Sequence, residues 1–186
     1  MRMALQPWKK LSTKPVFQSP YLSVNQNAWQ LPNGKIIDSY MSFERPDYVI
    51  MVGADQDGRI LFERQFRPAA NDFIIEMPAG FIEAGEEVTA TAAREFQEET
   101  GYPVVSTQSQ GFFYPLAGPS AMRGNLVFLR FDSSVEPQHN REEQETLECF
   151  LRTPQEAKEM LRKNEIHCLG AIASLSQYLL SLEDRP

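Results

Sequence analysis

The sequence predicts an α/β fold in which helices cover a mixed β-sheet and a small antiparallel sheet lies at the N-terminus. Short apolar runs with strand composition recur along the chain, turn residues separate them, and segments with helical features lie between and after them. This irregular alternation is typical of a mixed sheet covered by helices. The chain has 186 residues, 42% of them hydrophobic, which suffices for one packed domain, or for one with a small appendage.

The small sheet is expected from a hairpin near the N-terminus. Residues 21–30 and 35–43 have strand composition, and Leu31-Pro32-Asn33-Gly34 joins them through Asn-Gly, a strong hairpin signal. We therefore divide the chain into an N-terminal β-hairpin subdomain over residues 1–45 and a main domain over residues 46–186.

The main domain is expected to begin with strands and to end with helices. A second hairpin turns at Asp57-Gly58, and a later strand leads through Pro78-Ala79-Gly80 into a glycine-bounded loop. Thr153 and Glu156 have the spacing of a capping box that opens a helix. The predicted strands are residues 48–52, 59–66, 73–77, 125–131 and 147–151, and the last helix is residues 169–182.

An acidic cluster follows the loop, in the segment GFIEAGEEVTATAAREFQEETGY between Gly80 and Tyr102. As a helix, this segment places Glu95 and Glu99 one turn apart at the edges of the apolar arc, with Glu98 about 60° further round. We therefore expect these acids to be partly buried. Like charges, partial burial and the C-terminal half of a helix all disfavour such neighbouring carboxylates, so a positive charge must compensate.

Compensation is expected from an arginine and from a metal ion. Arg94 can pair with Glu98 one turn on, but one guanidinium cannot balance three carboxylates. A hard divalent cation with oxygen ligands is the natural missing charge, and Mg²⁺ is the first choice. The alternative is a solvated acidic helix that only keeps the chain in solution.

The spacing of the whole segment resembles the Nudix box. That resemblance implies a Nudix α/β/α sandwich with a mixed sheet, and hydrolysis of a nucleoside diphosphate linked to another group, with Mg²⁺ or Mn²⁺ and water as the nucleophile. Phe96 and Tyr102 are aromatic where bulky aliphatic residues are more usual. The fixed positions of the signature are occupied by Gly80, Glu86, Arg94, Glu95, Glu98, Glu99 and Gly101.

The resemblance implies a role for each charged residue of the box. Glu95 and Glu99 would be the principal metal ligands, and Glu98 a further or water-mediated ligand with a part in catalysis. The carbonyl of Ala79 would be a backbone ligand. Arg94 would orient the acids.

The glycines of the segment fit a phosphate-binding loop. Gly80 and Gly85 would allow positive φ and close backbone approach to the phosphates, and Gly101 suits the position just past the helix end. Each would also fit a plain turn.

The phrase before the box resembles the subgroup that hydrolyses ADP-ribose and nucleotide sugars, where an arginine-bearing strand precedes a Glu-bulky-Pro-Ala-Gly phrase. Because guanidinium forks suit pyrophosphate oxygens, Arg67 is our first choice for substrate binding and Arg64 the second. A surface charge or a structural ion pair is the alternative for both. Glu76 and Gly80 belong to the same phrase and complete the substrate-binding residues expected there.

Two loops after the box are expected to complete the site. In the subgroup a proline beyond the box marks sugar-nucleotide specificity, and Pro115 and Pro119 straddle that place, which favours a broad range of nucleotide sugars. A rigid loop would also explain both prolines. Related enzymes place a catalytic glutamate on a loop before the penultimate helix. There Glu143 is our choice of general base and Glu145 an assisting base or metal ligand, with Glu142 as the alternative. A solvated acidic loop would also explain each.

Base recognition calls for aromatic stacking, and suitable side chains lie in or just after the N-terminal sheet. Trp29 and Tyr40 are our choices, Phe43 and Tyr48 are alternatives, and any of them would also fit a core. The resemblance further implies a homodimer whose subunits exchange N-terminal strands and complete each other's pockets.

Composition argues against several other classes. A formal net charge of -7 and a pI near 4.9 argue against nucleic acid as a partner, and no stretch has the roughly 18 apolar residues that cross a bilayer. Cys149 and Cys168 lack ligand spacing, so we expect thiols in a reducing compartment, the cytoplasm. His139 and His167 are expected to be surface or core residues.

Two functions of different classes remain. The first is a metal-dependent pyrophosphatase that cleaves nucleoside diphosphate sugars, including ADP-ribose, into a nucleoside monophosphate and a sugar phosphate. The second is a Nudix-fold module that senses a nucleotide without turnover. Retention of all the box acids favours the enzyme, for which NADH, nucleoside triphosphates and dinucleoside polyphosphates are rival substrates.

Overall fold

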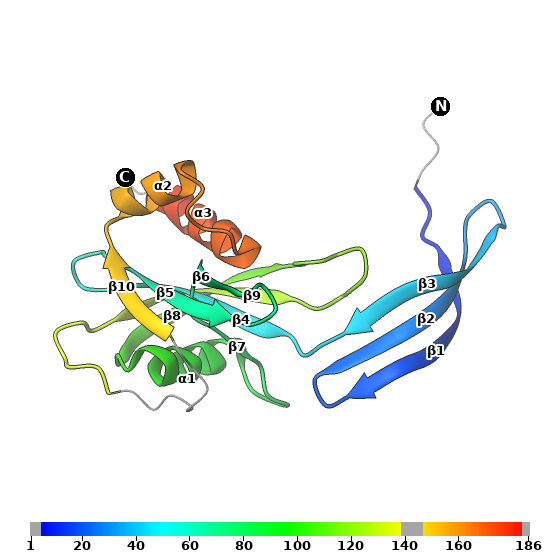
Figure 1. Cartoon of the computed structure of the whole chain (residues 1–186), viewed down its shortest axis with the longest axis horizontal. Coiled ribbons are helices and arrows are strands. Elements are labelled where there is room, and N and C mark those ends of the chain that lie inside the picture. The colour runs from blue at the N-terminus through cyan, green and yellow to red at the C-terminus, as the bar shows by residue number, and fades with distance from the viewer. Residues whose placement is uncertain (1–4, 139–146, 184–186) are drawn as a thin grey trace. The chain divides into compact units, whose positions relative to one another are not determined.

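The structure, a computed structural model, describes residues 5–138 and 147–183 of the chain. The chain forms two compact units (Figure 1). One comprises the residues up to Pro46 together with the loop Leu116–Met122, and the other comprises Asp47–Pro115 and the residues from Arg123 onward.

The first unit is built on a three-stranded antiparallel sheet with the order β1-β2-β3. Strand β2 (Leu22–Gln30) lies between β1 (Lys9–Ser19) and β3 (Ile36–Glu44), so the predicted hairpin is confirmed. Strand β1 was not predicted. It is exposed throughout, and Pro15 breaks its strand pattern; a proline is tolerated here because β1 is an edge strand.

The second unit contains a seven-stranded mixed sheet. Its path is β10-β5-β4-β9-β8, and β4 and β9 run parallel to each other. The predicted strands are all present, and β7 and β8 are additional. Strand β8 escaped prediction because it is a mostly exposed edge strand of polar residues with an irregular register. The strands are β4 (Tyr48–Ala54), β5 (Ile60–Arg67), β6 (Asp72–Glu76), β7 (Ala79–Phe81), β8 (Val104–Phe113), β9 (Gly124–Phe131) and β10 (Leu147–Arg152).

The sheet divides beside the turn that joins β4 to β5. Strands β4 and β5 pair with each other only at Ala54 and Ile60, next to the turn. Further from the turn the two strands separate, and the edge of β4 that faced β5 pairs with β7, whereas the edge of β5 that faced β4 pairs with β6. Met77 and Pro78 cross from one branch to the other, since β6 ends at Glu76 and β7 begins at Ala79. The branch point lies directly before the predicted metal-binding loop.

Helices cover both faces of this sheet (Figure 1). Helix α1 (Val88–Thr100) lies on one face, and α2 (Pro154–Arg162) and α3 (Leu169–Glu183) lie on the other. Strand β4 is buried on both sides because its alternate residues enter the two cores, Val49 and Met51 toward α1, and Ile50, Val52 and Ala54 toward α3. The predicted α/β/α sandwich with an additional small sheet is confirmed.

The predicted capping box at the start of α2 is present. The Thr153 hydroxyl accepts a hydrogen bond from the Glu156 backbone N–H at 3.3 Å, and the Glu156 carboxylate accepts one from the Thr153 N–H at 2.8 Å. Among the described residues, no helix is long and apolar enough to span a membrane.

Candidate active site

The box folds as the loop and helix that the sequence predicts. Gly85 has a φ of 85° in the loop, and Gly101 has a φ of 75° directly after α1, where its N–H donates to the carbonyl of Gln97. These values confirm the positive φ expected at Gly85 and the helix-ending position of Gly101.

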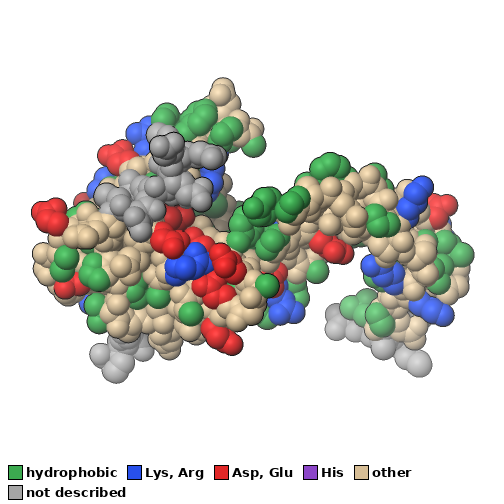
Figure 2. All heavy atoms as spheres, turned by 90° about the horizontal axis from the view of Figure 1, so that it is seen from below, with side chains coloured by type: hydrophobic (Ala, Val, Ile, Leu, Met, Phe, Trp, Pro, Cys, Tyr) green, Lys and Arg blue, Asp and Glu red, His purple; other side chains and the backbone are tan. Residues whose placement is uncertain are grey.

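Arg94 binds three carboxylates of the box. Its Nε and Nη2 donate to the two oxygens of Glu86 at 3.0 and 2.9 Å, which makes this pair bidentate. Its Nη1 donates to Glu95 at 2.9 Å and to Glu98 at 3.0 Å. Figure 2 shows acidic side chains gathered around basic ones on the face of this unit that carries α1. The predicted pair of Arg94 and Glu98 is confirmed, whereas the bidentate bond to Glu86 was missed because it crosses from loop to helix.

The acids differ in their electrostatic environments. The side chain of Glu95 is 18% exposed and that of Glu98 is 47% exposed, and Glu99 is half-buried, which confirms the expected partial burial. Hydrogen bonds from Arg94 lower the pKa of Glu86 to about 2. By contrast, burial raises the pKa of Glu95, although Arg94 acts in the opposite direction. Glu95 therefore carries a carboxylate whose charge Arg94 does not fully compensate.

Two acids of α1 meet the backbone of β7 at adjacent residues. The Ala79 N–H donates to Oε2 of Glu99 at 3.2 Å, and the side chain of Glu95 lies so close to Gly80 that an added Cβ would overlap its Cγ and Cδ. Gly80 is thus required for close approach, and the positive φ expected for it is wrong, because the positive-φ glycines do not include it. Glu95 and Glu99 are brought together at Ala79-Gly80.

The donor set at this point suits a small hard cation. Within residues 5–138 and 147–183, no group of three or more His, Cys, Asp or Glu side chains is arranged to hold a metal ion. However, Mg²⁺ in proteins commonly uses one or two carboxylates and retains water molecules and substrate oxygens as its other ligands. The N–H and C=O of a residue in a strand point to the same side, so the Ala79 carbonyl is expected to face the side of Glu99. Two carboxylates and one carbonyl therefore fit a magnesium site.

The arginines of β5 lie in different environments. Arg67 donates from Nε and Nη2 to Oε2 of Glu76, at 2.7 and 2.6 Å. Arg64 lies over the ring of Phe73, with 5.0 Å between its guanidinium carbon and the ring centroid. Glu76, which anchors the Arg67 guanidinium, is three residues before Ala79, so at most about 11 Å of extended chain separates it from the residue that Glu99 contacts.

The aromatic residues proposed for base recognition are distributed over the two units. In the first unit, Trp29 and Tyr40 make an edge contact with 6.4 Å between ring centroids. Trp8, which sequence reasoning missed, packs against Tyr40 at 6.3 Å. Tyr48 belongs to the second unit, where it packs against Phe113, and burial raises its pKa to about 12. Tyr48 is therefore a partly buried residue packed against the core of the second unit.

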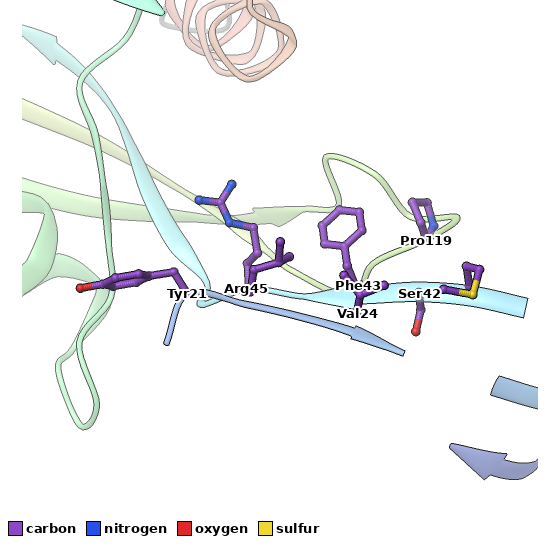
Figure 3. Close-up of a pocket in the computed structure, with 8 residues that line it drawn as sticks. Tyr21, Val24, Ser42, Phe43, Arg45 and Pro119 are labelled. Carbon is purple, nitrogen blue, oxygen red and sulfur yellow. The ribbon is translucent and has the colours of Figure 1, made fainter. Parts of the chain in front are cut away.

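Phe43 lines an open apolar pocket of about 500 Å³ within the first unit (Figure 3). Tyr21 and Arg45 lie at its wall, and neither was singled out from the sequence, because single residues at strand ends give no periodic signal. Pro119 contributes to the same pocket, and its carbonyl accepts a hydrogen bond from the Phe43 N–H at 2.9 Å. Pro115 belongs to the second unit.

Several predicted residues cannot be placed or lie away from the box. Glu142, Glu143, Glu145 and His139 are outside the described residues. His167 is exposed, and neither cysteine forms a disulfide in the described part of the chain.

Comparison with known proteins agrees with this geometry. The NUDIX domain matches residues 44–169. Over 160 residues, the chain is 30% identical to the ADP-ribose pyrophosphatase of Bacillus subtilis (strain 168), covering 86% of this chain and 85% of that protein. Over 104 residues, it is 38% identical to the ADP-ribose pyrophosphatase of Saccharomyces cerevisiae, covering 51% of this chain and 44% of that protein.

A solved structure supports the fold. The crystal structure of an ADP compounds hydrolase matches with a TM-score of 0.83 at 19% sequence identity, over 100% of both chains. This structural match and the family match over more than half of the sequence both agree with the Nudix-box resemblance of residues 80–102. The chain belongs to the NUDIX family and is an enzyme.

Proposed function

We propose that this enzyme hydrolyses the pyrophosphate bond of nucleoside diphosphate sugars, including ADP-ribose, and uses a divalent cation, Mg²⁺ or alternatively Mn²⁺. The observation that carries the proposal is the meeting of Glu95 and Glu99 at the backbone of Ala79 and Gly80. Two carboxylates beside the Ala79 carbonyl would provide oxygen ligands for a hard cation at the start of a loop proposed to bind phosphate.

The chain's own residues would divide the work of binding and orientation. Glu95, Glu99 and the Ala79 carbonyl would hold the cation, and Glu98 would contribute a further or water-mediated ligand. When bound, the cation would offset charge on the non-bridging phosphate oxygens and lower the pKa of the attacking water. Arg94 would keep the Glu95 and Glu98 carboxylates oriented through its two Nη1 hydrogen bonds.

Substrate binding would use the opposite branch of the sheet. The guanidinium of Arg67 would bind a phosphate oxygen, and Arg64, stacked on Phe73, is the weaker candidate. Trp29 or Tyr40 would recognise the base. Proton removal from water would fall to Glu143, with Glu145 assisting, because carboxylates engaged with metal are poor proton acceptors.

The substrate class rests on the relatives. Both pyrophosphatases named above are described as acting on ADP-ribose, and the one from Bacillus subtilis aligns over most of both chains. The presence of both Pro115 and Pro119 favours a broader range of nucleotide sugars. The homodimer and the cytoplasmic location stay predictions.

A product assay tests the proposal. Purified enzyme with Mg²⁺ is incubated with ADP-ribose, GDP-mannose, UDP-glucose, NADH and a nucleoside triphosphate, and products are separated by ion-exchange chromatography. We expect a nucleoside monophosphate and a sugar phosphate from the sugars, and loss of turnover with EDTA. Turnover of none of them would reject catalysis in favour of sensing, and preference for the triphosphate would reject the sugar substrates.

Two variants connect turnover to the site. Glu99→Gln should abolish the response to Mg²⁺, whereas Glu159→Gln, which changes an exposed acid on α2, should leave turnover near the wild-type level. Glu143→Gln should lower kcat with little change in KM. Wild-type turnover in Glu143→Gln would transfer the role of base to Glu145 or Glu142.

A further inference from the structure

Arg67 is held along one edge of its guanidinium. Nε and Nη2 both donate to a single oxygen of Glu76, Oε2, at 2.7 and 2.6 Å. Within the part of the chain that the structure describes, Nη1 has no hydrogen bond or ion pair. The Arg67 side chain is 48% exposed, so this second edge is accessible to a ligand. Two bonds on one edge and an open edge opposite are the geometry of a fixed anion-binding fork.

Glu76 is anchored in turn by the start of α3. Cys168, the residue directly before α3, interacts electrostatically with the Glu76 carboxylate through its thiol, and α3 contacts β6, the strand that ends at Glu76. The Cys168 carbonyl accepts a hydrogen bond from the Ile172 N–H at 3.0 Å, so Cys168 lies at the cap position of the helix. Burial raises the pKa of Cys168, which keeps the thiol protonated as a donor at neutral pH.

The chain of contacts joins a core element to an exposed side chain. The side chain of Glu76 is 14% exposed, Cys168 packs against the core on the α3 face, and α3 contacts β4 in the centre of the sheet. An unsupported arginine on a surface strand samples many rotamers, and ordering it on binding weakens affinity. In this structure, the bonds to Glu76 order the Arg67 side chain without a ligand.

We propose that Glu76 and Cys168 are positioning residues that fix Arg67 for the diphosphate of the substrate. This proposal rests on the proposed function, in which Arg67 binds a phosphate oxygen. It assigns Glu76 to Arg67 and not to direct substrate contact, and it gives Cys168 a part in substrate affinity, although its thiol does not touch the substrate.

Binding of a substrate analogue that resists hydrolysis tests the relay. Affinity for α,β-methylene ADP-ribose is measured by calorimetry for wild type, Glu76→Gln, Cys168→Ala and Cys168→Ser. We expect Glu76→Gln and Cys168→Ala to weaken binding by about 3- to 10-fold, the effect of leaving one long side chain unordered. Serine retains a donor for Glu76 and an acceptor for the helix cap, so Cys168→Ser should bind like wild type. With ADP-ribose itself, the weakened variants should show a raised KM and an unchanged kcat.

Matched controls separate the relay from general damage. Glu159→Gln removes an acid that pairs with Arg162 on α2, and Cys149→Ala removes the other thiol; both should bind like wild type. If Glu76→Gln fails to fold, Arg67→Lys replaces it, because lysine keeps the charge but cannot make two bonds to one edge. The order of the Arg67 side chain can also be measured in the free enzyme, by ¹⁵N relaxation of its Nε–H group. This group should be ordered in wild type and mobile in Glu76→Gln.

The outcomes distinguish this proposal from the function on which it rests. Unchanged affinity in Glu76→Gln, or equal affinity in Cys168→Ala and Cys168→Ser, overturns the relay. A Cys168→Ala variant with a lowered Tm and wild-type affinity would also overturn the relay, because Cys168 would then stabilise only the start of α3. An analogue that binds to a wild-type enzyme without turnover refutes hydrolysis and leaves the relay standing. An analogue that does not bind overturns the relay, because Arg67 then has no diphosphate to fix.

Discussion

Replacing Gly80 by alanine is expected to displace the carboxylate of Glu95 while leaving the fold intact. A Cβ on Gly80 would overlap Cγ, Cδ and Oε2 of that side chain. Non-bonded carbon atoms normally lie about 3.5–4.0 Å apart, so the carboxylate must move by more than about 1 Å. A displacement of about 1 Å at a reacting centre lowers turnover about 100-fold, which corresponds to about 2.7 kcal/mol. The measurement is kcat for ADP-ribose at saturating Mg²⁺.

Gly53→Ala is the matched control for this variant. Gly53 lies on β4 and faces the same helix, but its added Cβ would lie 2.6 and 2.8 Å from ring atoms of Phe96, away from the acids. Such overpacking costs about 1–3 kcal/mol, which lowers Tm by about 2–12 °C in a chain of this size. At temperatures where it is folded, Gly53→Ala should retain the wild-type kcat. Wild-type turnover in Gly80→Ala, or equal losses of turnover in both variants, would refute the reasoning.

Three further predictions concern the Arg94 network and the α2 cap. Arg94→Lys should lower kcat/KM about 10- to 100-fold at constant Mg²⁺, because lysine cannot hold Glu86 and Glu98 simultaneously in a planar fork; wild-type kinetics would contradict this. Hydrogen bonding from Arg94 depresses the pKa of Glu86 from 4.5 to about 2, so its contribution to the free energy of unfolding is present above about pH 4.5 and is lost as the pH falls toward 2. In urea titrations, wild type and Glu86→Gln should therefore differ at neutral pH and converge in that window, and parallel curves would exclude the mechanism. Thr153→Ala should cost about 1 kcal/mol and lower Tm by about 2–4 °C, with KM unchanged; an unchanged Tm would show that the capping box does not stabilise α2.

Local patterns predicted most of the fold. The N-terminal hairpin follows from Asn33-Gly34, the start of α2 follows from Thr153 and Glu156, and the end of α1 follows from Gly101. Each of these signals acts within a few residues, so no tertiary context was needed. Strand β1 was missed because its pairing with β2 overrides an unfavourable composition, and pairing is not visible in a single segment.

The contacts of the box were predicted where they obey helical spacing, and other contacts were missed. Arg94 and Glu98 are one turn apart, so their ion pair followed from the sequence, as did the position of Glu95 beside the apolar arc. The bond between Arg94 and Glu86 depends on how the loop turns back onto α1. The contact between Glu76 and Cys168 joins segments far apart in the chain and depends on the packing of α3 against β6. No local rule predicts either contact.

The division of the sheet explains how the proposed site would draw on both kinds of contact. The branch that ends in β6 carries Glu76 and, through it, Arg67, whereas the branch that begins with β7 carries Ala79 and Gly80 beside the acids of α1. Only Met77 and Pro78 separate the two strands along the chain, and Pro78 has its φ fixed by its ring. The Met51 N–H also donates to the Pro78 carbonyl at 2.9 Å, which ties the crossing to β4. Covalent geometry and sheet pairing therefore set the spacing between Arg67, proposed to bind phosphate, and Ala79, whose carbonyl is proposed to bind the cation, as alignment of a diphosphate for attack by water would require.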